Sequence, residues 1–417
     1  MRVYLRTFGC RANQYDTETA RAMIEGAGHA IVTDEAQADV AVFNSCAVTA
    51  EAEADLRHAV RRAARSREGL RSVIMGCASA LPDRHDALSL RRLPSVEHLI
   101  AGADMPVLAV ALDLPTDVSL FRASAQSSVR ALLRIQDGCD EHCTFCATTL
   151  ARGANRSRPV ADLVAEARAL AGHHEEIVIT GIHIGSYGRD AGGSLGELIE
   201  RLVRDVPRVR FRLSSLEATE VDERLFALLV QEPARVAPHL HAPLQSGSDA
   251  ILKRMGRHWY TADRYARVVE RLVVQCSVFG LGADIIVGFP GETEADHNRT
   301  VALVERLPFT YLHVFPFSLR PGTAAERLGA AVPSSTVVRR ARELRDMAAH
   351  KGAAYRSARN GGRADVIVIR GGPTATRDGL TEDYLSVLPS DASLPRGARY
   401  DARLALEAER LTAMPNS

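Results

Sequence analysis

The chain has 417 residues, which is long enough for two or three domains, and its apolar content is ample for their cores. Its 52 basic and 51 acidic residues give a formal charge of +1, which excludes a global electrostatic field for a polyanionic partner. The seven cysteines follow no secretory pattern, and we see neither an N-terminal apolar signal segment nor an 18-residue apolar span. We therefore expect a cytoplasmic protein with reduced thiols and no membrane association.

Residues 1–112 alternate strand-like and helix-like patterns, which is typical of a compact α/β domain. Cys10, Cys46 and Cys77 each end an apolar, strand-like run, in the order VYLRTFGC, VAVFNSC and SVIMGC. Helical patterns lie between them, over TETARAMIEGAG and AEADLRHAVRRAARS. If the three runs are neighbours in one parallel sheet, their thiols lie at the edge where α/β folds place ligands. The alternative is three unrelated buried cysteines at strand ends.

Residues 113–128 have weak periodicity with proline and serine, and we interpret them as a linker. From residue 129 to residue 360 the strand and helix patterns alternate six times. The expected strands are ALLRI, EIVITG, VRFRLSS, HLHAPL, GADIIVGF and YLHVFPF, and the clearest helices are VADLVAEARALAG, LGELIERLVRDV and TADRYARVVERLVVQ. Repeated βα units predict a parallel sheet with right-handed crossovers, and six of them predict an incomplete (β/α)6 barrel.

The first of these strands leads into RIQDGCDEHCTFC, where Cys139, Cys143 and Cys146 have the spacing C-x-x-x-C-x-x-C. Three thiolates from one loop can hold three irons of a 4Fe-4S cube and leave the fourth iron without a protein ligand. A structural zinc site would need a fourth ligand, which His142 can supply. Zinc and a chance cluster of core cysteines therefore remain alternatives. Cys276 lies in the helical pattern RVVERLVVQCSVFG, which favours the core.

Polar or glycine residues follow the later strands of the predicted barrel, where such barrels place their chemistry. This arrangement suits a cofactor cradle, although each such residue taken singly is also an ordinary turn former. The candidate cofactor contacts at these strand ends are Thr180, Gly181, Ser214, Glu217 and Gln245.

Residues 361–417 change to short β-prone pieces with turn signals between them, namely ADVIVIR, DYLSVLP and ARYDARLALEAERL. We expect a small antiparallel β-barrel here. Its basic and acidic residues roughly balance, so charge does not indicate nucleic-acid binding. The predicted fold is thus α/β in three parts: a domain with a parallel sheet, a partial barrel and a small β-barrel.

The order of these motifs resembles the methylthiotransferase family of radical S-adenosylmethionine (SAM) enzymes, over essentially the whole chain. The tail is similar to the TRAM barrel of that family. The resemblance implies one 4Fe-4S cluster on Cys10, Cys46 and Cys77, and a second on the central cysteines whose open iron chelates SAM. It also implies that Phe145 lies against the adenine of SAM. The blocks that carry the resemblance are TFGCRANQYDTE, NSCAVT, MGC, IQDGCDEHCTFC, ARGANRSRP, TGIHIGSYG, LSSLE, HLHAPLQSGSDAILKRMGR, DIIVGFPGETEAD, HVFPFSLRPGT and GLTEDYLSV.

The opening TFGC with NQYDTE, and the later NSCAVT, resemble the branch of this family that modifies N6-threonylcarbamoyladenosine at position 37 of tRNA. The isopentenyl-adenosine branch more often opens with TYGC and N-x-x-DS, and the branch acting on a ribosomal-protein aspartate opens more like SLGC. These two substrates remain alternatives if the protein is an enzyme. If it is not an enzyme, the alternative is an iron-sulfur protein that binds RNA or senses redox state.

The implied reaction places sulfur on C2 of adenine, an unactivated aromatic carbon, and therefore calls for a radical from reductive cleavage of SAM. The family implies that a second SAM methylates sulfur held at the N-terminal cluster. It also implies an electron donor such as flavodoxin or ferredoxin, a sulfur source, and a tRNA anticodon loop as partners. A base in that loop is already single-stranded and can enter a pocket.

Arginines supply the expected tRNA contacts, and Arg11 beside Cys10 is the candidate partner for the substrate carboxylate. The chain departs from the family pattern at Ala147-Thr148-Thr149, which replaces an Ile-Ile-Pro-like run, and we expect this change to leave the thiolates untouched. The arginines proposed for tRNA are Arg57, Arg61, Arg62, Arg65, Arg152, Arg156 and Arg158.

Overall fold

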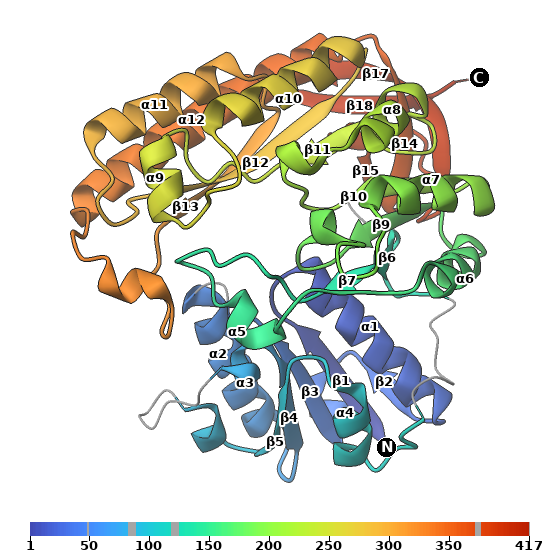
Figure 1. Ribbon diagram of the computed structural model, residues 1–417. Helices are drawn as coiled ribbons and strands as arrows, with labels where there is room; N and C mark the ends of the chain where they lie inside the picture. The colour runs from blue at the N-terminus through green and yellow to red at the C-terminus, as the bar shows by residue number, and fades with distance from the viewer. Residues whose placement is uncertain (48–49, 82–88, 118–124, 372–376, 417) are drawn as a thin grey trace.

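The computed structural model describes residues 1–47, 50–81, 89–117, 125–371 and 377–416. Figure 1 shows the chain in three parts: an N-terminal sheet with its helices in blue, a central arc of strands and helices from green to orange, and a C-terminal barrel in red. Residues 118–124 of the predicted linker lie outside the described residues.

The N-terminal part is a five-stranded parallel sheet covered by helices on both faces. Its strands are β1 (Arg2–Thr7), β2 (Ala30–Val32), β3 (Val40–Ser45), β4 (Arg71–Gly76) and β5 (Val96–Ala101), and its helices are α1 (Arg11–Gly26), α2 (Ala50–Ser66), α3 (Cys77–Ala80) and α4 (Met105–Ala111). The strand order is β2-β1-β3-β4-β5. Apolar side chains of α1 and α4 pack on one face and those of α2 on the other. The three cysteine-bearing strands are therefore neighbours, as the sequence predicts.

The first helix begins at Arg11, earlier than the predicted start at Thr17. The reason is that Asn13 and Asp16, on the first turns, are fully buried polar residues. A buried polar side chain interrupts the apolar periodicity by which a helix is recognised in a sequence.

The central part contains six parallel strands in chain order. They are β6 (Ala131–Arg134), β9 (Glu176–Thr180), β10 (Arg210–Leu213), β11 (His239–His241), β12 (Gly280–Val287) and β13 (Tyr311–Pro316). They pair as two three-stranded sheets, and an isolated parallel bridge from Ser215 to His241 joins the two. Strand β11 is shorter than predicted because Pro238 and Pro243 lack the N–H that a ladder requires. The predicted incomplete six-unit barrel is confirmed.

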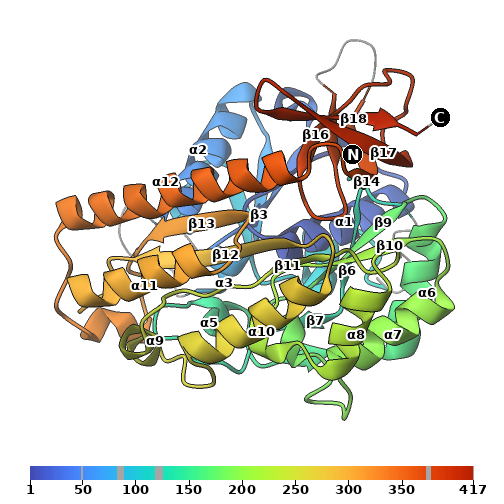
Figure 2. The same ribbon diagram turned by 90° about the horizontal axis from the view of Figure 1, so that it is seen from above.

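Helices cover the outside of this arc of strands, as Figure 2 shows for α6, α7, α8, α10 and α11. The helices of the central part are α5 (Thr148–Arg152), α6 (Val160–Ala171), α7 (Leu195–Asp205), α8 (Glu223–Gln231), α9 (Asp249–Arg254), α10 (Ala262–Gln275), α11 (Glu294–Arg306) and α12 (Ser334–Ala358). Two short strands, β7 (Gln136–Asp137) and β8 (Arg156–Ser157), pair antiparallel around the cysteine loop.

The C-terminal part is a closed five-stranded barrel in the order β14-β15-β16-β18-β17. Its strands are β14 (Arg363–Arg370), β15 (Asp378–Leu380), β16 (Ser386–Pro389), β17 (Arg399–Glu407) and β18 (Arg410–Pro415). The prediction of an antiparallel barrel holds except for one pair, because β16 and β18 run parallel. Since β17 pairs with both β14 and β18, closing the barrel leaves β18 beside β16 in the same direction.

A buried cluster of charges joins this barrel to the central sheet. Glu176 on β9 is fully buried and accepts hydrogen bonds from Nε of Arg210 at 2.7 Å and Nε of Arg212 at 2.8 Å. The same arginines donate to barrel carbonyls, Arg210 to Asp365 and Arg212 to Glu382, each at 2.9 Å. The cluster thereby links strands of the sheet to the barrel backbone.

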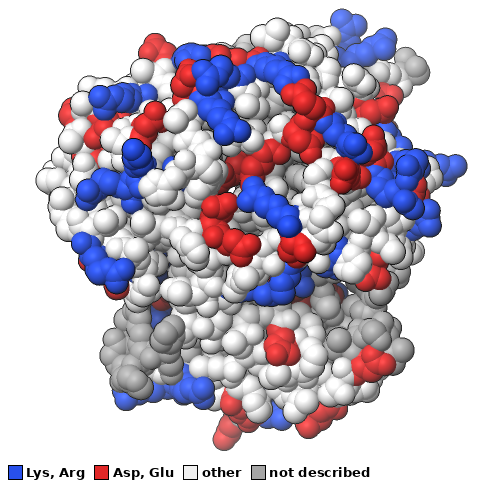
Figure 3. Space-filling view, viewed as in Figure 1, with Lys and Arg blue, Asp and Glu red and all other residues white. Residues whose placement is uncertain are grey.

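The surface carries both signs of charge. On the face shown in Figure 3, blue and red side chains are intermixed over the central part. Many are paired, such as Arg271 with Glu223 and Arg306 with Glu270. Within the described residues, no helix is both long enough and apolar enough to cross a bilayer.

Candidate active site

Three cysteines meet at the carboxyl edge of the N-terminal sheet. Cys10 precedes α1, Cys46 directly follows β3, and Cys77 is the first residue of α3 after β4. Gly9 has a φ of +101°, and a Cβ at this position would lie 2.6 Å from Sγ of Cys46. Only glycine therefore lets the Cys10 loop pass so close to Cys46.

Asn13 connects the loops that carry the cysteines of this first trio. Its Nδ2 donates to the carbonyls of Phe8 at 3.1 Å and Ser45 at 2.7 Å. Its Oδ1 lies 3.6 Å from Sγ of Cys10 and 3.9 Å from Sγ of Cys77. One buried amide thus fixes two backbone turns and faces two thiols.

Arg152 completes the surroundings of Cys77. Its Nε donates to Sγ of Cys77 at 3.3 Å, and its Nη2 lies 2.8 Å from both Asn13 Oδ1 and Asp16 Oδ2. Burial raises the pKa of Cys77 to about 11, and the charge of Arg152 acts in the opposite direction. Arg152 is 5% exposed, so its predicted role as a tRNA contact is wrong. Its guanidinium instead stabilises negative charge on this thiol.

The central cysteines lie in the loop between β7 and α5. Gly138 precedes them with a φ of +74°, and a Cβ there would lie 1.9 Å from the carbonyl oxygen of Ala154. The backbone N–H of Cys139 donates to the carbonyl of Gly153 at 3.0 Å. These close contacts between the two ends of the loop fix the course of the chain that presents the three thiols.

Each thiol of this second trio has a polar neighbour. Cys139 Sγ lies 3.7 Å from Nδ1 of His183, and Arg257 Nη1 donates to Cys143 Sγ at 3.4 Å. Burial raises the pKa of Cys143 to about 12, and Arg257 again opposes the shift. Each trio therefore has a cysteine, buried Cys77 or half-buried Cys143, beside a buried arginine.

Cys146 contacts Thr148, which corrects one expectation. Sγ of Cys146 lies 3.1 Å from Oγ1 of Thr148 and accepts the Thr148 N–H at 3.4 Å. The segment Ala147-Thr148-Thr149 was expected to leave the thiolates untouched, but Thr148 begins α5 and turns both groups toward the sulfur.

One cysteine of each trio lines a single cavity of about 260 Å³. Cys77 of the first trio and Cys146 of the second lie in its wall, so the cavity connects the two sites. The rest of the wall is mainly apolar, with a few polar groups. Its lining includes Phe145, Gln245, Asp284, Phe315 and Phe317.

The structure brings only part of the predicted cofactor contacts to this cavity. Phe145 and Gln245 line it. Thr180, Gly181 and Ser214 lie at the carboxyl ends of β9 and β10, outside the cavity wall as the described residues form it.

Glu217 reaches the second trio through its neighbours. It forms an ion pair with Arg257 and accepts a hydrogen bond from Nε1 of Trp259. Because Arg257 donates to Cys143, the carboxylate of Glu217 positions the arginine beside the thiol. Cys276, the seventh cysteine, follows α10 and packs against the barrel core, as expected.

Sequence reasoning missed Asn13, Asp16, Arg257 and Asp284. All four lie in the motif blocks, but each is a polar residue inside or beside a pattern interpreted as a helix or strand. A polar residue that interrupts a predicted buried face was the signal that could have identified them.

An open arc of six parallel strands, whose first strand leads into a C-x-x-x-C-x-x-C loop, defines a radical SAM protein. Residues 133–304 match the radical SAM superfamily, and residues 2–99 match an uncharacterised protein family, UPF0004. The fold is similar to the radical SAM methyltransferase TsrM from Kitasatospora setae, with a TM-score of 0.57 at 15% identity over 90% of this chain and 79% of that one.

Similar proteins with assigned names indicate the family of radical SAM proteins to which the chain belongs. The chain is 36% identical to the threonylcarbamoyladenosine tRNA methylthiotransferase MtaB of Thermotoga maritima, over 85% of this chain and 83% of that protein. It is 32% identical to MtaB of Aquifex aeolicus, over 93% and 96%. A tRNA-2-methylthio-N(6)-dimethylallyladenosine synthase from Parafrankia sp. is 33% identical over 88% and 78%. The chain belongs to the radical SAM tRNA methylthiotransferase family and is similar to its MtaB members.

The two trios fit the cofactors of this family, which are 4Fe-4S clusters and SAM. All seven cysteines are free, and soft thiolates in sets of three suit an iron-sulfur cube with one open iron. Cys10, Cys46 and Cys77 would hold one cluster, and Cys139, Cys143 and Cys146 the other. His142, the fourth ligand considered for zinc, is exposed.

We expect the anaerobically reconstituted protein to contain two 4Fe-4S clusters, because the thiols form two separate sets. Replacing either trio by alanine should leave about half of the iron and sulfide, as measured by metal and sulfide analysis. Cys276→Ala is the matched control and should retain both clusters. Stoichiometric zinc without iron in the anaerobic protein would contradict this assignment.

Proposed function

We propose that the protein transfers a methylthio group to C2 of N6-threonylcarbamoyladenosine at position 37 of tRNA. The observation that carries the proposal is the cavity whose wall contains one cysteine of each trio, Cys77 and Cys146. One site must activate the substrate carbon and the other must deliver sulfur, so the base has to reach both. A shared cavity between the two sets of thiols meets this requirement.

The residues around the cavity suit such a reaction. When bound, the clusters and SAM supply the radical and the sulfur chemistry. Arg152 and Arg257 hold positive charge beside buried thiols, and Asn13 fixes the loops of the first trio. The largely apolar wall, including Phe145 and Phe317, excludes water from the reacting centre.

Two arguments support the threonylcarbamoyl substrate. The relatives from Thermotoga maritima and Aquifex aeolicus carry that substrate in their names. The cavity wall also includes polar groups such as Asp284 and Gln245. A polar N6 substituent can bond to the amide of Gln245 and to Oδ2 of Asp284, whose Oδ1 already bonds His241 and His313, and an isopentenyl group cannot.

The tRNA would contact exposed arginines, of which Arg156 on β8 lies beside the cysteine loop. Arg61, Arg65 and Arg156 are exposed, whereas Arg57 is buried. We include an anticodon loop as substrate partner, together with a sulfur source and an electron donor such as flavodoxin or ferredoxin.

The test offers the reconstituted enzyme two tRNAs, one with threonylcarbamoyladenosine and one with isopentenyl-adenosine at position 37. With SAM and a reductant, we expect the methylthio product from the first tRNA only, detected by nucleoside mass spectrometry. Preference for the isopentenyl form, or modification of a ribosomal-protein aspartate instead, would refute the proposed substrate. An unmodified tRNA serves as the control for background.

A further inference from the structure

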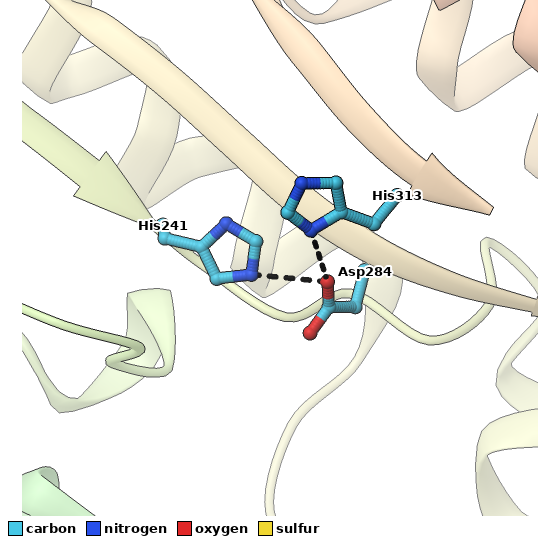
Figure 4. Close-up of side chains that lie close together, drawn as sticks. All are labelled: His241, Asp284 and His313. Atoms are coloured by element: carbon cyan, nitrogen blue, oxygen red, sulfur yellow. Dashed lines mark hydrogen bonds and ion pairs between the residues drawn. The ribbon is translucent and has the colours of Figure 1, made fainter. Parts of the chain in front are cut away.

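Three adjacent strands place two histidines around one carboxylate at the cavity. His241 ends β11, Asp284 lies in β12, and His313 lies in β13 directly opposite Asp284 in the register. Nε2 of His241 and Nδ1 of His313 each lie 3.1 Å from the same oxygen, Oδ1 of Asp284. Figure 4 shows this arrangement. The three side chains form what we term the His-Asp-His cluster.

Two polar atoms of the cluster face away from these bonds. Figure 4 shows Oδ2 of Asp284 and Nε2 of His313 directed away from the shared contact. Asp284 lines the cavity between the cysteine trios, and the side chain of His313 is 55% exposed. The cluster therefore presents a carboxylate oxygen that accepts a hydrogen bond and, on its other side, Nε2 of His313, which donates in the imidazolium form because Nδ1–H already faces Asp284.

A chain of side chains holds the cluster in place. Nδ1 of His241 lies 3.1 Å from the hydroxyl of Tyr311, which lies 2.8 Å from Nε2 of buried His239. His239 stacks on Tyr384 of the C-terminal barrel at 4.5 Å, and Arg11 donates to the Tyr384 hydroxyl at 3.1 Å. Residues of the N-terminal part, the central sheet and the C-terminal barrel thus all help to hold the His-Asp-His cluster in position.

An aromatic surface adjoins the cluster. Phe315 lies two residues after His313 on β13, with ring centroids 6.2 Å apart, and it lines the same cavity. Residues two apart in a strand share a face. Unstacked bases in RNA recognition commonly lie against aromatic rings. A base against Phe315 would bring its substituent to the His-Asp-His cluster.

We propose that the His-Asp-His cluster is the specificity site for the N6 substituent of the base, with Asp284 accepting its ureido N–H and His313 donating to its carboxylate. This inference rests on the proposed function. A threonylcarbamoyl group offers both partners, and an isopentenyl group offers neither. Arg11, which reaches the cluster through Tyr384, His239 and Tyr311, then supports the cluster and does not itself need to meet the carboxylate.

A bound divalent metal is the competing explanation. The separation of 3.1 Å between ligand atoms also suits two ligands of one metal ion. We favour the substituent because Oδ1 already joins both rings by hydrogen bonds, and because Asp284 lies in the wall of the cavity that the base must enter.

The test measures binding rather than turnover. Full-length protein with both clusters is titrated, without reductant, into fluorescent anticodon stem-loops that carry threonylcarbamoyladenosine either as the free acid or as its methyl ester. We expect wild type to bind the acid about tenfold more tightly, the effect of one charge-assisted hydrogen bond. His313→Phe should remove this difference, and Asp284→Asn should weaken binding of both forms. His350→Phe, on exposed α12, is the matched control and should behave as wild type.

The outcomes separate this inference from the proposed function. If His313→Phe retains the preference for the acid while wild type methylthiolates the threonylcarbamoyl tRNA, the cluster is not the specificity site and the function stands. If wild type modifies the isopentenyl tRNA instead, the proposed substrate is wrong, and the inference that rests on it is wrong as well. Stoichiometric divalent metal beyond the cluster iron, lost in His313→Phe, would overturn the inference in favour of a metal site. Circular dichroism of each variant verifies its fold.

Discussion

Replacing Cys139, Cys143 and Cys146 together by alanine will abolish reductive cleavage of SAM to 5′-deoxyadenosine. Only this trio comes from a single short loop at the mouth of the barrel, so a cluster held there would place its open iron where SAM can bind. Replacing Cys10, Cys46 and Cys77 will leave SAM cleavage measurable but abolish the methylthio product. The two products are measured in the same reaction by mass spectrometry.

The surroundings of the trios explain why the two losses should differ. Arg257 and His183 contact the central thiols, whereas Asn13 and Arg152 contact the N-terminal ones. Each trio therefore keeps its own polar shell when the other is removed. Cys276→Ala should retain both activities. Normal methylthio transfer without the N-terminal trio would show that those cysteines are only structural.

Local patterns predict the strands and helices that carry the cysteines. The parallel order of β1, β3 and β4 follows from apolar runs separated by helical patterns, and the cysteine spacing identifies the second trio. These features depend on residues close together in the sequence. A single sequence is therefore sufficient to predict them.

The polar shell of each site depends on contacts between distant segments, and there the predictions fail. Arg152 was assigned to the tRNA-contacting surface together with the other arginines of its block, but it is buried. Its partners Asp16 and Asn13 lie far away in the sequence, and they make its burial possible. The cavity itself combines segments from the N-terminal sheet, α5, β12 and β13, an arrangement that no local pattern contains.

Glu176→Gln should lower the stability of the protein strongly, by about 3–5 kcal/mol, because it leaves buried arginines without their counter-charge. Glu176, Arg210 and Arg212 are all fully buried. Burial would raise the pKa of Glu176, but the charges of Arg212 and Arg210 outweigh it and hold this pKa well below its ordinary value of 4.5. The native carboxylate therefore contributes stability above about pH 4.5, which is lost as the pH falls below it.

The measurement compares the denaturation midpoints of wild type, Glu176→Gln and Glu175→Gln by circular dichroism. Glu175 is the exposed neighbour on the same segment, so its substitution removes a charge but leaves both buried arginines paired with Glu176. Because Arg210 and Arg212 also donate to the carbonyls of Asp365 and Glu382, Glu176→Gln should make the C-terminal barrel the first region cut by a protease. Equal midpoints for the two variants would mean that packing alone, and not the buried charge cluster, holds the barrel on the sheet.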